Sequence, residues 1–214
     1  MRNENQPVAL EGYPFIAFFA FVTLVMALLN WSFFTVIFLA LTIFSVFFFR
    51  NPDRTIPQGD NLVVSPADGK VVFADVVLED RMLNQEMLKI SIFMSVFNVH
   101  VNRVPCSGKI IDQFYNKGKF FNAALDKASL ENEQAGMLLE LSGGTKIIVV
   151  QIAGLIARRI VTYPVIGDMI ERGQRYGLIR FGSRLDVYLP KDAALQVKLG
   201  DHCVAGETIL GKLV

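Results

Sequence analysis

No charged side chain occurs between Glu11 and Arg50. One helix needs about 20 apolar residues to cross a bilayer, and this run is longer than a single crossing requires. Its most polar point, Asn30–Ser32, lies near the middle and predicts an interfacial turn. Residues 1–50 are therefore predicted to form a transmembrane helical hairpin, with spans at about 15–29 and 33–49.

The length and flanks of this hairpin bear on its topology. At ~1.5 Å per residue each span reaches about 23–26 Å, slightly less than the ~30 Å hydrocarbon core, so full and re-entrant hairpins both stay open. A cleaved signal peptide fits less well, because its apolar region has about 7–15 residues and ends at an A-x-A site. Arg50 and Arg54 follow the second span, and positive residues favour the cytoplasmic side. We expect the cell (inner) membrane, with the following domain on its cytoplasmic face.

Residues 51–214 have the composition of a water-soluble domain, with 19 Lys and Arg against 18 Asp and Glu. This balance gives no reason to expect a nucleic-acid partner. The two cysteines, Cys106 and Cys203, are far apart, and a secreted disulfide framework would show more of them. Two reduced, partly buried thiols agree with a body that faces the cytosol.

Short runs rich in Val, Ile and Phe, broken by Gly, Pro and Asp, predict strands in this body. They are Leu62–Val64, Val71–Val77, Leu88–Val101, Thr145–Ile152, Ile160–Val165, Leu178–Ile179 and Leu185–Leu189. Helical periodicity occurs only around Phe120–Ser129, and weakly. The fold class is thus mainly β (α+β), an antiparallel β domain behind the helical hairpin.

A short pattern occurs twice near the C-terminus. Gly167–Gln174 and Gly200–Glu207 both read G-D-x-x-x-x-G-[QE], with hydrophobic runs on both sides. Gly at such places allows tight turns with positive φ. The repeated turns resemble those of barrel-sandwich domains, although common turn residues could also coincide by chance.

Among residues able to do chemistry, His100 is the most informative. Alternation along a strand would put Asn98, His100 and Asn102 on one face, which suggests a lined cavity. A structural histidine remains the alternative. Asp68, in Ser65–Lys70, lies in an Asp-Gly pair that a hairpin turn alone would explain. Gly182–Ser183 is by itself a common pair.

The sequence lacks the residues that several other kinds of catalytic or binding site need. Two remote histidines and two remote cysteines do not make a zinc site, and no metal is expected. The sequence has no G-x-S-x-G elbow, Walker loop or dinucleotide fingerprint.

Taken together, four stretches resemble the phosphatidylserine decarboxylase family, and most closely its short, archaeal-type branch. They are Phe48–Arg54, Ser65–Val71, Asn98–Pro105 and Tyr176–Arg184, and they follow one another in the family's order. Four ordered motifs are specific where one alone is not. A hydrophobic N-terminus is also usual in this family.

The resemblance implies a proenzyme that cuts itself between Gly182 and Ser183. The Ser183 hydroxyl would attack the Gly182 carbonyl, and elimination and hydrolysis would leave a pyruvoyl group at position 183. The products would be a β chain, 1–182, and an α chain, 183–214, which together form a heterodimer. The covalent pyruvoyl cofactor would act as electron sink for the decarboxylation of phosphatidylserine in the membrane.

The resemblance also assigns roles to other residues. His100 would assist decarboxylation and protonation, and Asp68 would orient or activate the groups used in self-cleavage. Asn98, Asn102, Arg103 and Arg184 are candidate substrate contacts, Arg184 for the lipid phosphate.

Two departures from the family pattern bear on these roles. Arg103 replaces a second histidine found in longer members, so the base for self-cleavage is either His100 or Asp68. The cleavage site reads F-G-S-R, where the better-known members have L-G-S-T.

Two other functions fit parts of the sequence. A membrane-tethered barrel-sandwich adaptor or carrier would explain the hairpin and the repeat, but it would need an attachment lysine, commonly in Met-Lys, and that pair is absent. A membrane-bound serine hydrolase would match Asp68, His100 and Ser183 by residue type. Phosphatidylserine and archaetidylserine share the head group, and the sequence does not separate them. A higher oligomer also stays open.

Overall fold

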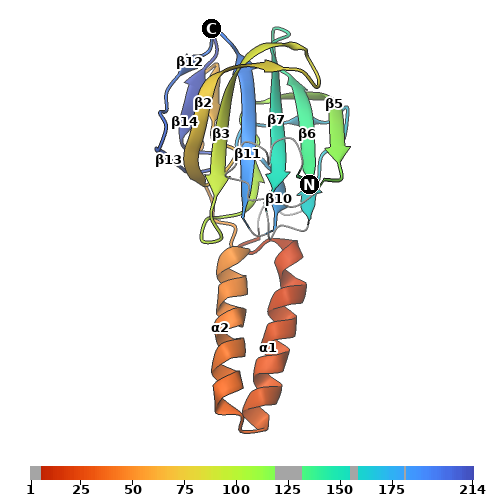
Figure 1. Ribbon diagram of the computed structural model, residues 1–214, viewed down its shortest axis with the longest axis vertical. Helices are drawn as coiled ribbons and strands as arrows, with labels where there is room; N and C mark the ends of the chain where they lie inside the picture. Colours follow the sequence, from red (N-terminus) through yellow and green to blue (C-terminus); the bar gives the residue numbers. More distant parts are fainter. Residues whose placement is uncertain (1–5, 119–131, 155–158, 181) are drawn as a thin grey trace. The chain divides into compact units, whose positions relative to one another are not determined.

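The computed structural model describes residues 6–118, 132–154, 159–180 and 182–214. The chain divides into two compact units, Met1–Asp53 and Arg54–Val214. In the described residues, helices form the first unit and strands the second (Figure 1). The weak helical pattern at Phe120–Ser129 lies outside the described residues.

The first unit contains two apolar helices, α1 (Tyr13–Leu28) and α2 (Ser32–Phe48), after the short 3-10 helix η1 (Leu10–Gly12). Asn30, with a φ of 58°, reverses the chain between them, a conformation that Asn tolerates better than most residues. The helices pack side by side, and the ring centroids of Phe19 and Phe38 are 6.5 Å apart. By length and composition, Leu10–Leu28 is the one described helix that could cross a membrane, and Ser32–Phe48 is apolar but shorter.

The second unit is built around a curled antiparallel sheet of eight strands. Its order is β13-β2-β3-β11-β7-β6-β5-β9. These strands are β13 (His202–Cys203), β2 (Gly69–Glu79), β3 (Gln85–Met94), β11 (Ser183–Pro190), β7 (Lys146–Ala153), β6 (Gln134–Glu140), β5 (Gly108–Asn116) and β9 (Met169–Ile170).

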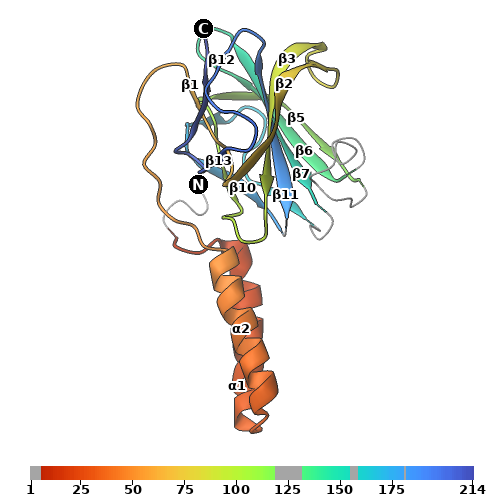
Figure 2. The ribbon, with the colours of Figure 1, turned by 60° about the vertical axis from the view of Figure 1, so that its left-hand side comes forward.

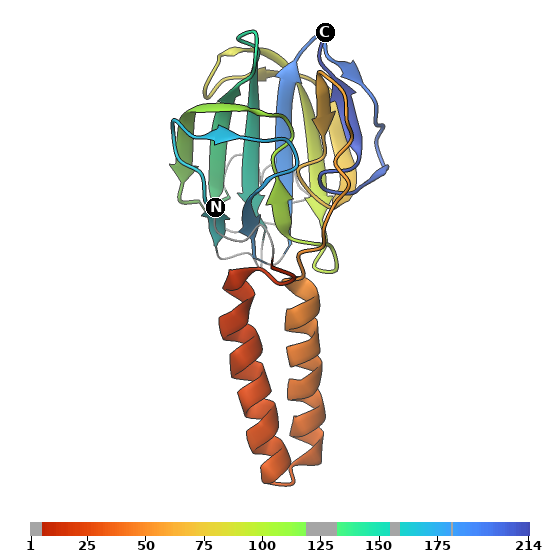
Figure 3. The ribbon, with the colours of Figure 1, turned by 180° about the vertical axis from the view of Figure 1, so that it is seen from behind.

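Two smaller antiparallel sheets complete this unit. One has the order β4-β10-β8, with strands Val101–Arg103, Arg175–Ile179 and Ile160–Thr162. The other has the order β1-β14-β12, with strands Leu62–Val64, Ile209–Lys212 and Ala194–Leu195. Figure 2 shows β1 and β12 on one side of the large sheet, and Figure 3 gives the view from behind.

The core lies on the inner face of the large sheet. Ile147, Val149 and Ala153 of β7 join the main apolar cluster there, which also takes in Tyr176 and Ile179 of β10. Ile148 and Ile152 of β7 belong to a smaller cluster on the other face. Because β7 is covered on both faces, its sequence is a continuous apolar run rather than an alternating one.

The mainly β, antiparallel fold predicted from the sequence is confirmed, with one error that matters for the site. The run Leu88–Val101 is not one strand, because β3 ends at Met94 and β4 begins at Val101. Asn98 closes a turn between them: its Oδ1 accepts hydrogen bonds from the Ser95 amide at 2.9 Å and the Ser95 hydroxyl at 2.8 Å. Asn98 therefore does not share a strand face with His100 and Asn102.

The G-D repeat has the same hydrogen bonds in both copies. Asp168 Oδ2 accepts from the Val165 amide at 2.9 Å, and Asp201 Oδ2 accepts from the Lys198 amide at 3.0 Å. The first glycine of each copy, Gly167, then Gly200, has a positive φ, 99° and 94°. The two copies are thus the same turn built twice. Their likeness to barrel-sandwich domains stays a prediction.

Candidate active site

Four neighbouring strands of the large sheet, β2, β3, β11 and β7, begin or end at the same end of the sheet, which we call the site edge. Ser183, the first residue of β11, pairs with Met94 at the end of β3 and with Ala153 at the end of β7. On the far side of β3, the register of β2 pairs Lys70 with Phe93. The site edge positions the sequence motifs around Ser183.

The Gly182–Ser183 peptide is held in a specific geometry. Gly182 has a φ of +68°, a conformation that favours glycine. Its carbonyl oxygen accepts a hydrogen bond from the Gly154 amide at 3.0 Å. Ser183 is fully buried, and its hydroxyl donates to the Met94 sulfur at 3.3 Å. A thioether is a weak acceptor, so the hydroxyl is held only loosely.

His100 contacts the same peptide segment. Its Nδ1 lies 2.9 Å from the Asn98 carbonyl oxygen, which can only accept, so Nδ1 carries the proton. Its Nε2 is then the acceptor nitrogen and accepts from the Gly182 amide at 3.2 Å. The side chain is 1% exposed. The structure therefore brings a neutral imidazole next to the predicted cleavage site.

Asp68 is close to the site edge but has other partners. Its carboxylate accepts two hydrogen bonds from one Arg54 nitrogen, at 2.9 and 3.1 Å, and one from the Ala205 amide at 2.8 Å. Asp68 precedes β2, which is separated from β11 by β3. At ~4.8 Å per strand, its backbone lies about 10 Å from that of Ser183. Asp68 is thus placed to hold loops together rather than to touch the hydroxyl.

A buried chain of neutral polar groups runs from Ser183 along the inner face. Asn102 is fully buried, donates to the Met94 sulfur at 3.7 Å and accepts from the Gln151 amide at 2.8 Å. Gln151 in turn accepts from the Thr162 hydroxyl at 2.8 Å. Asn102, predicted as a substrate contact, is therefore part of the hydrogen-bonded lining around Met94.

The two arginines predicted as substrate contacts have structural partners. Arg103 donates from its backbone to the Pro66 carbonyl at 2.9 Å and from its side chain to the Gly173 carbonyl at 2.8 Å. Arg184 lies on the opposite face from Ser183, because side chains alternate along β11. It is 3% exposed and forms an ion pair with Asp186 at 2.9 Å. This geometry does not support Arg184 as the phosphate contact.

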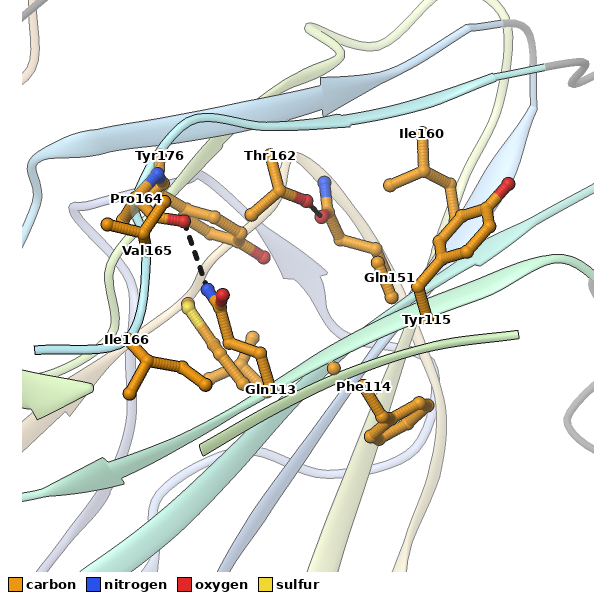
Figure 4. A pocket seen from close by; sticks show the side chains of 14 residues that line it. Gln113, Phe114, Tyr115, Gln151, Ile160, Thr162, Pro164, Val165, Ile166 and Tyr176 are labelled. Atoms are coloured by element: carbon orange, nitrogen blue, oxygen red, sulfur yellow. Dashed lines mark hydrogen bonds between the residues drawn. The ribbon is translucent and has the colours of Figure 1, made fainter. Parts of the chain in front are cut away.

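A pocket of about 540 Å³ opens beside this polar chain (Figure 4). Its walls come from β5, β6 and β7 of the large sheet and from the segment that carries β8 and β10. Gln151 and Thr162 line the pocket. The pocket therefore begins where the series of hydrogen bonds that starts at Met94 ends. Tyr176 is also in the wall, and its hydroxyl points into the pocket in Figure 4.

Burial sets the protonation of the weak acids in this unit. It raises the pKa of the Tyr176 hydroxyl far above its usual value, so the phenol stays protonated. It also raises the pKa of Cys106 to about 12 and that of Cys203 to about 11. Both thiols are free and buried, as the sequence predicts. In the described residues, His, Cys, Asp and Glu form no group of three that could hold a metal.

Sequence reasoning missed Met94, Gly154, Gln151 and Tyr176. Gln151 had a signal, because it is the one amide in the apolar run Ile147–Ala153. Gly154 and Met94 had none of comparable strength. They reach Ser183 only through long-range strand pairing, which local patterns do not reveal.

Comparison with known proteins shows the family of this chain. The family model described as phosphatidylserine decarboxylase matches residues 41–211. The chain is 64% identical to the phosphatidylserine decarboxylase proenzyme of Syntrophotalea carbinolica, covering all of both chains. The proenzymes of the same name from Geotalea uraniireducens and Geobacter metallireducens are 61% and 59% identical, again over the full lengths.

These matches identify the chain as a decarboxylase made as a proenzyme. The chain belongs to the phosphatidylserine decarboxylase family. This membership disfavours the adaptor, the carrier and the serine hydrolase as alternatives.

Proposed function

We propose that this chain cuts itself between Gly182 and Ser183 and then converts phosphatidylserine into phosphatidylethanolamine and CO2. The observation that carries the proposal is the Gly182–Ser183 peptide itself. Its serine hydroxyl is buried beside a carbonyl that already accepts a hydrogen bond from the Gly154 amide. The family of the chain and the proenzyme names of its relatives support the same function.

The first step is attack of Ser183 Oγ on the carbonyl carbon of Gly182. Negative charge develops on the Gly182 oxygen, where the Gly154 amide, 3.0 Å away, stabilises it. The bond from this carbon to the Ser183 nitrogen breaks, the nitrogen gains the proton that the hydroxyl lost, and an ester replaces the amide. Gly182 has no side chain to crowd the attacked carbon.

His100 is the proposed base for this step. Its unprotonated Nε2 accepts a hydrogen bond from the amide of Gly182, the residue that precedes Ser183. Asp68 is two strands away and bound to Arg54, so it acts as a positioning residue. Its contact with Ala205, and that of Arg103 with Pro66, tie together the loops around the His100 segment.

Elimination then completes the maturation. The Cα proton of residue 183 is lost, the Gly182 carboxylate leaves from Cβ, and a dehydroalanine remains. Water replaces its nitrogen, which departs as ammonia, and residue 183 becomes a pyruvoyl group. The β chain, 1–182, and the α chain, 183–214, stay together because β11 pairs with β3 and β7 of the β chain.

The residues present fit a pyruvoyl group at position 183. The start of β11 is buried between Met94 and Ala153, and the described side-chain contact of Ser183 is the neutral Met94 sulfur, which also accepts from Asn102. The ketone supplies an electron sink for the loss of CO2. His100 holds and returns the proton that replaces the carboxylate, because a neutral imidazole suits proton transfer near pH 7.

The first unit is proposed to anchor the enzyme next to its substrate. α1 buries none of its residues, and large apolar side chains such as Phe21 and Phe33 are mostly exposed, as lipid contact requires. We propose that α1 and α2 form a hairpin in the cell membrane. Arg50 and Arg54 favour the cytoplasmic side for the catalytic unit.

The test combines cleavage with turnover. Wild type and Ser183→Ala are purified in detergent, run on denaturing gels and assayed for CO2 release from carboxyl-labelled phosphatidylserine. Wild type should give two chains and activity, and Ser183→Ala one chain without activity. Ser91→Ala, another buried serine in the neighbouring strand β3, is the matched control and should cleave normally. Full activity of uncut Ser183→Ala would overturn the proposal.

A further inference from the structure

We propose that the pocket beside Gln151 holds the ester end of one acyl chain of the lipid substrate, with Tyr176 donating a hydrogen bond to the ester carbonyl. This inference rests on the proposed function, since it names what the same site recognises. The pocket, of about 540 Å³, has the size of small-molecule sites in general. Its walls are mainly apolar, with Met137, Val149 and Ile160 among them.

Charge excludes the ionic head group from this pocket. None of the described residues that line it carries a charge. A phosphate or carboxylate moved from water into such a place would lose its hydration without an ionic partner, which is costly. A neutral segment of the lipid avoids this cost. The neutral segment nearest to the head group is the glycerol with its two esters.

Tyr176 supplies the specific polar contact. The residue is 1% exposed, and its hydroxyl has no hydrogen-bond partner among the described residues. Its raised pKa keeps the proton in place, so the group is a donor at any working pH. An ester carbonyl accepts a hydrogen bond and brings no donor or charge of its own. It therefore satisfies the hydroxyl that Figure 4 shows pointing into the pocket.

The position of the pocket agrees with this occupant. Gln151 lies on β7 two residues before Ala153, the partner of Ser183. Gln151 and Ser183 are thus diagonal neighbours on one face, about 7–8 Å apart. An ester in the pocket would therefore lie on the same sheet face as residue 183, where the serine of the head group reacts.

The rim of the pocket is open and mainly apolar. Val165, Ile166 and the ring of Tyr115 line it and are 57–60% exposed, and the Tyr115 hydroxyl donates to the Glu133 carboxylate at 2.9 Å. Apolar side chains at an opening suit a hydrocarbon chain that enters from a lipid phase. The remaining part of the acyl chain would leave over these residues.

The experiment maps the acyl chain directly on the full-length protein in detergent micelles. The probe is a phosphatidylserine with a photoreactive diazirine on one acyl chain, close to the ester. Labelled peptides are identified by mass spectrometry in wild type, Ala135→Phe, Tyr176→Phe and Tyr188→Phe. Ala135→Phe fills the pocket from β6, and Tyr176→Phe removes only the hydroxyl. Tyr188→Phe makes the same change in a tyrosine of β11 that packs with the outer-face cluster.

We expect wild-type label on residues 135–137 and 160–166. Ala135→Phe should lower this label and kcat/KM for dioleoylphosphatidylserine by about tenfold, with self-cleavage complete. Tyr176→Phe should raise KM about threefold to tenfold, the loss expected for one neutral hydrogen bond, and leave cleavage unchanged. Tyr188→Phe should change neither the label nor KM.

Label confined to other segments, or label that Ala135→Phe does not reduce, would overturn the inference. If Ala135→Phe fails to fold, the wild-type map and Tyr176→Phe still decide. Failure of the proposed function looks different, because wild type would then neither cleave nor release CO2, whatever the label shows.

Discussion

Residues 183 and 184 are adjacent in the chain, yet they lie on two very different faces of β11. On the inner face, the described contacts of Ser183 are a methionine sulfur and, beyond it, neutral amides. On the outer face, Arg184 and Lys89 both form ion pairs with the buried Asp186, at 2.9 and 3.1 Å. We infer that the ion pairs on the outer face hold β11 in the sheet. The neutral inner face is where residue 183 is converted.

The largest effect is expected from His100→Gln on the inner face. Gln can still accept a hydrogen bond from the Gly182 amide, but it cannot take a proton. Self-cleavage should slow by about 10²–10⁴, the usual contribution of a general base. The time course of chain cleavage after synthesis in a cell-free system measures this. His202→Gln changes an exposed histidine and should cleave at the wild-type rate; a normal rate in His100→Gln would remove His100 from the mechanism.

Asp186→Ala tests the outer face. It leaves Arg184 and Lys89 without their buried partner, which should cost about 3–5 kcal/mol of unfolding free energy. Denaturant unfolding of the uncut Ser183→Ala chain, with and without this change, gives the difference. Glu86→Ala breaks the exposed pair with Lys191, whose side chain is 66% exposed, and should cost under about 1 kcal/mol. Equal losses for both variants would contradict an anchoring role for the outer face.

Gly154→Pro returns to the inner face and removes the amide that donates to the Gly182 carbonyl. Cleavage should slow by about 10²–10³, the cost of losing one oxyanion donor. Gly154→Ala keeps the amide and is the control for the added side chain. If both variants cleave at the same reduced rate, the amide is not the cause.

Met94→Leu should have the smallest effect. It removes the sulfur that accepts from Ser183 and keeps the side-chain volume, so the cost should stay below about 1.5 kcal/mol. Cleavage should slow less than about tenfold, as followed on denaturing gels. Met87→Leu makes the same change in a buried methionine of the outer-face cluster and should not affect cleavage. A complete block by Met94→Leu would mean that the sulfur does more than hold the hydroxyl.

The sequence predicts the parts of this site that are local. Strand patterns locate β2, β3, β7 and β11, and the four family motifs point to Asp68, His100 and Gly182–Ser183. The face assigned to Asn98 was wrong because the turn at Ser95–Asn98 contains no Gly or Pro and looks like a strand. The turn is closed by a backbone hydrogen bond from the Asn98 amide to the Ser95 carbonyl at 3.0 Å, together with the hydrogen bond from the Ser95 hydroxyl to the Asn98 side chain.

Other parts of the site depend on pairing between distant segments. Gly154 and Met94 come next to Ser183 because β7 and β3 flank β11. Sequence alternation tells which side of a strand a residue takes, but not which strand lies beside it. The opposite faces of Ser183 and Arg184, and the shared face of Arg184 and Asp186, follow from alternation alone, whereas the pairing of Lys89 with Asp186 is seen only in the structure.

The most direct test of the account is mass spectrometry of the smaller chain in active protein. We predict a fragment that runs from position 183 to Val214, whose first residue lacks an amine and carries a ketone that borohydride reduces. Active material made of one unbroken chain, or a fragment that starts with an ordinary serine, would contradict it.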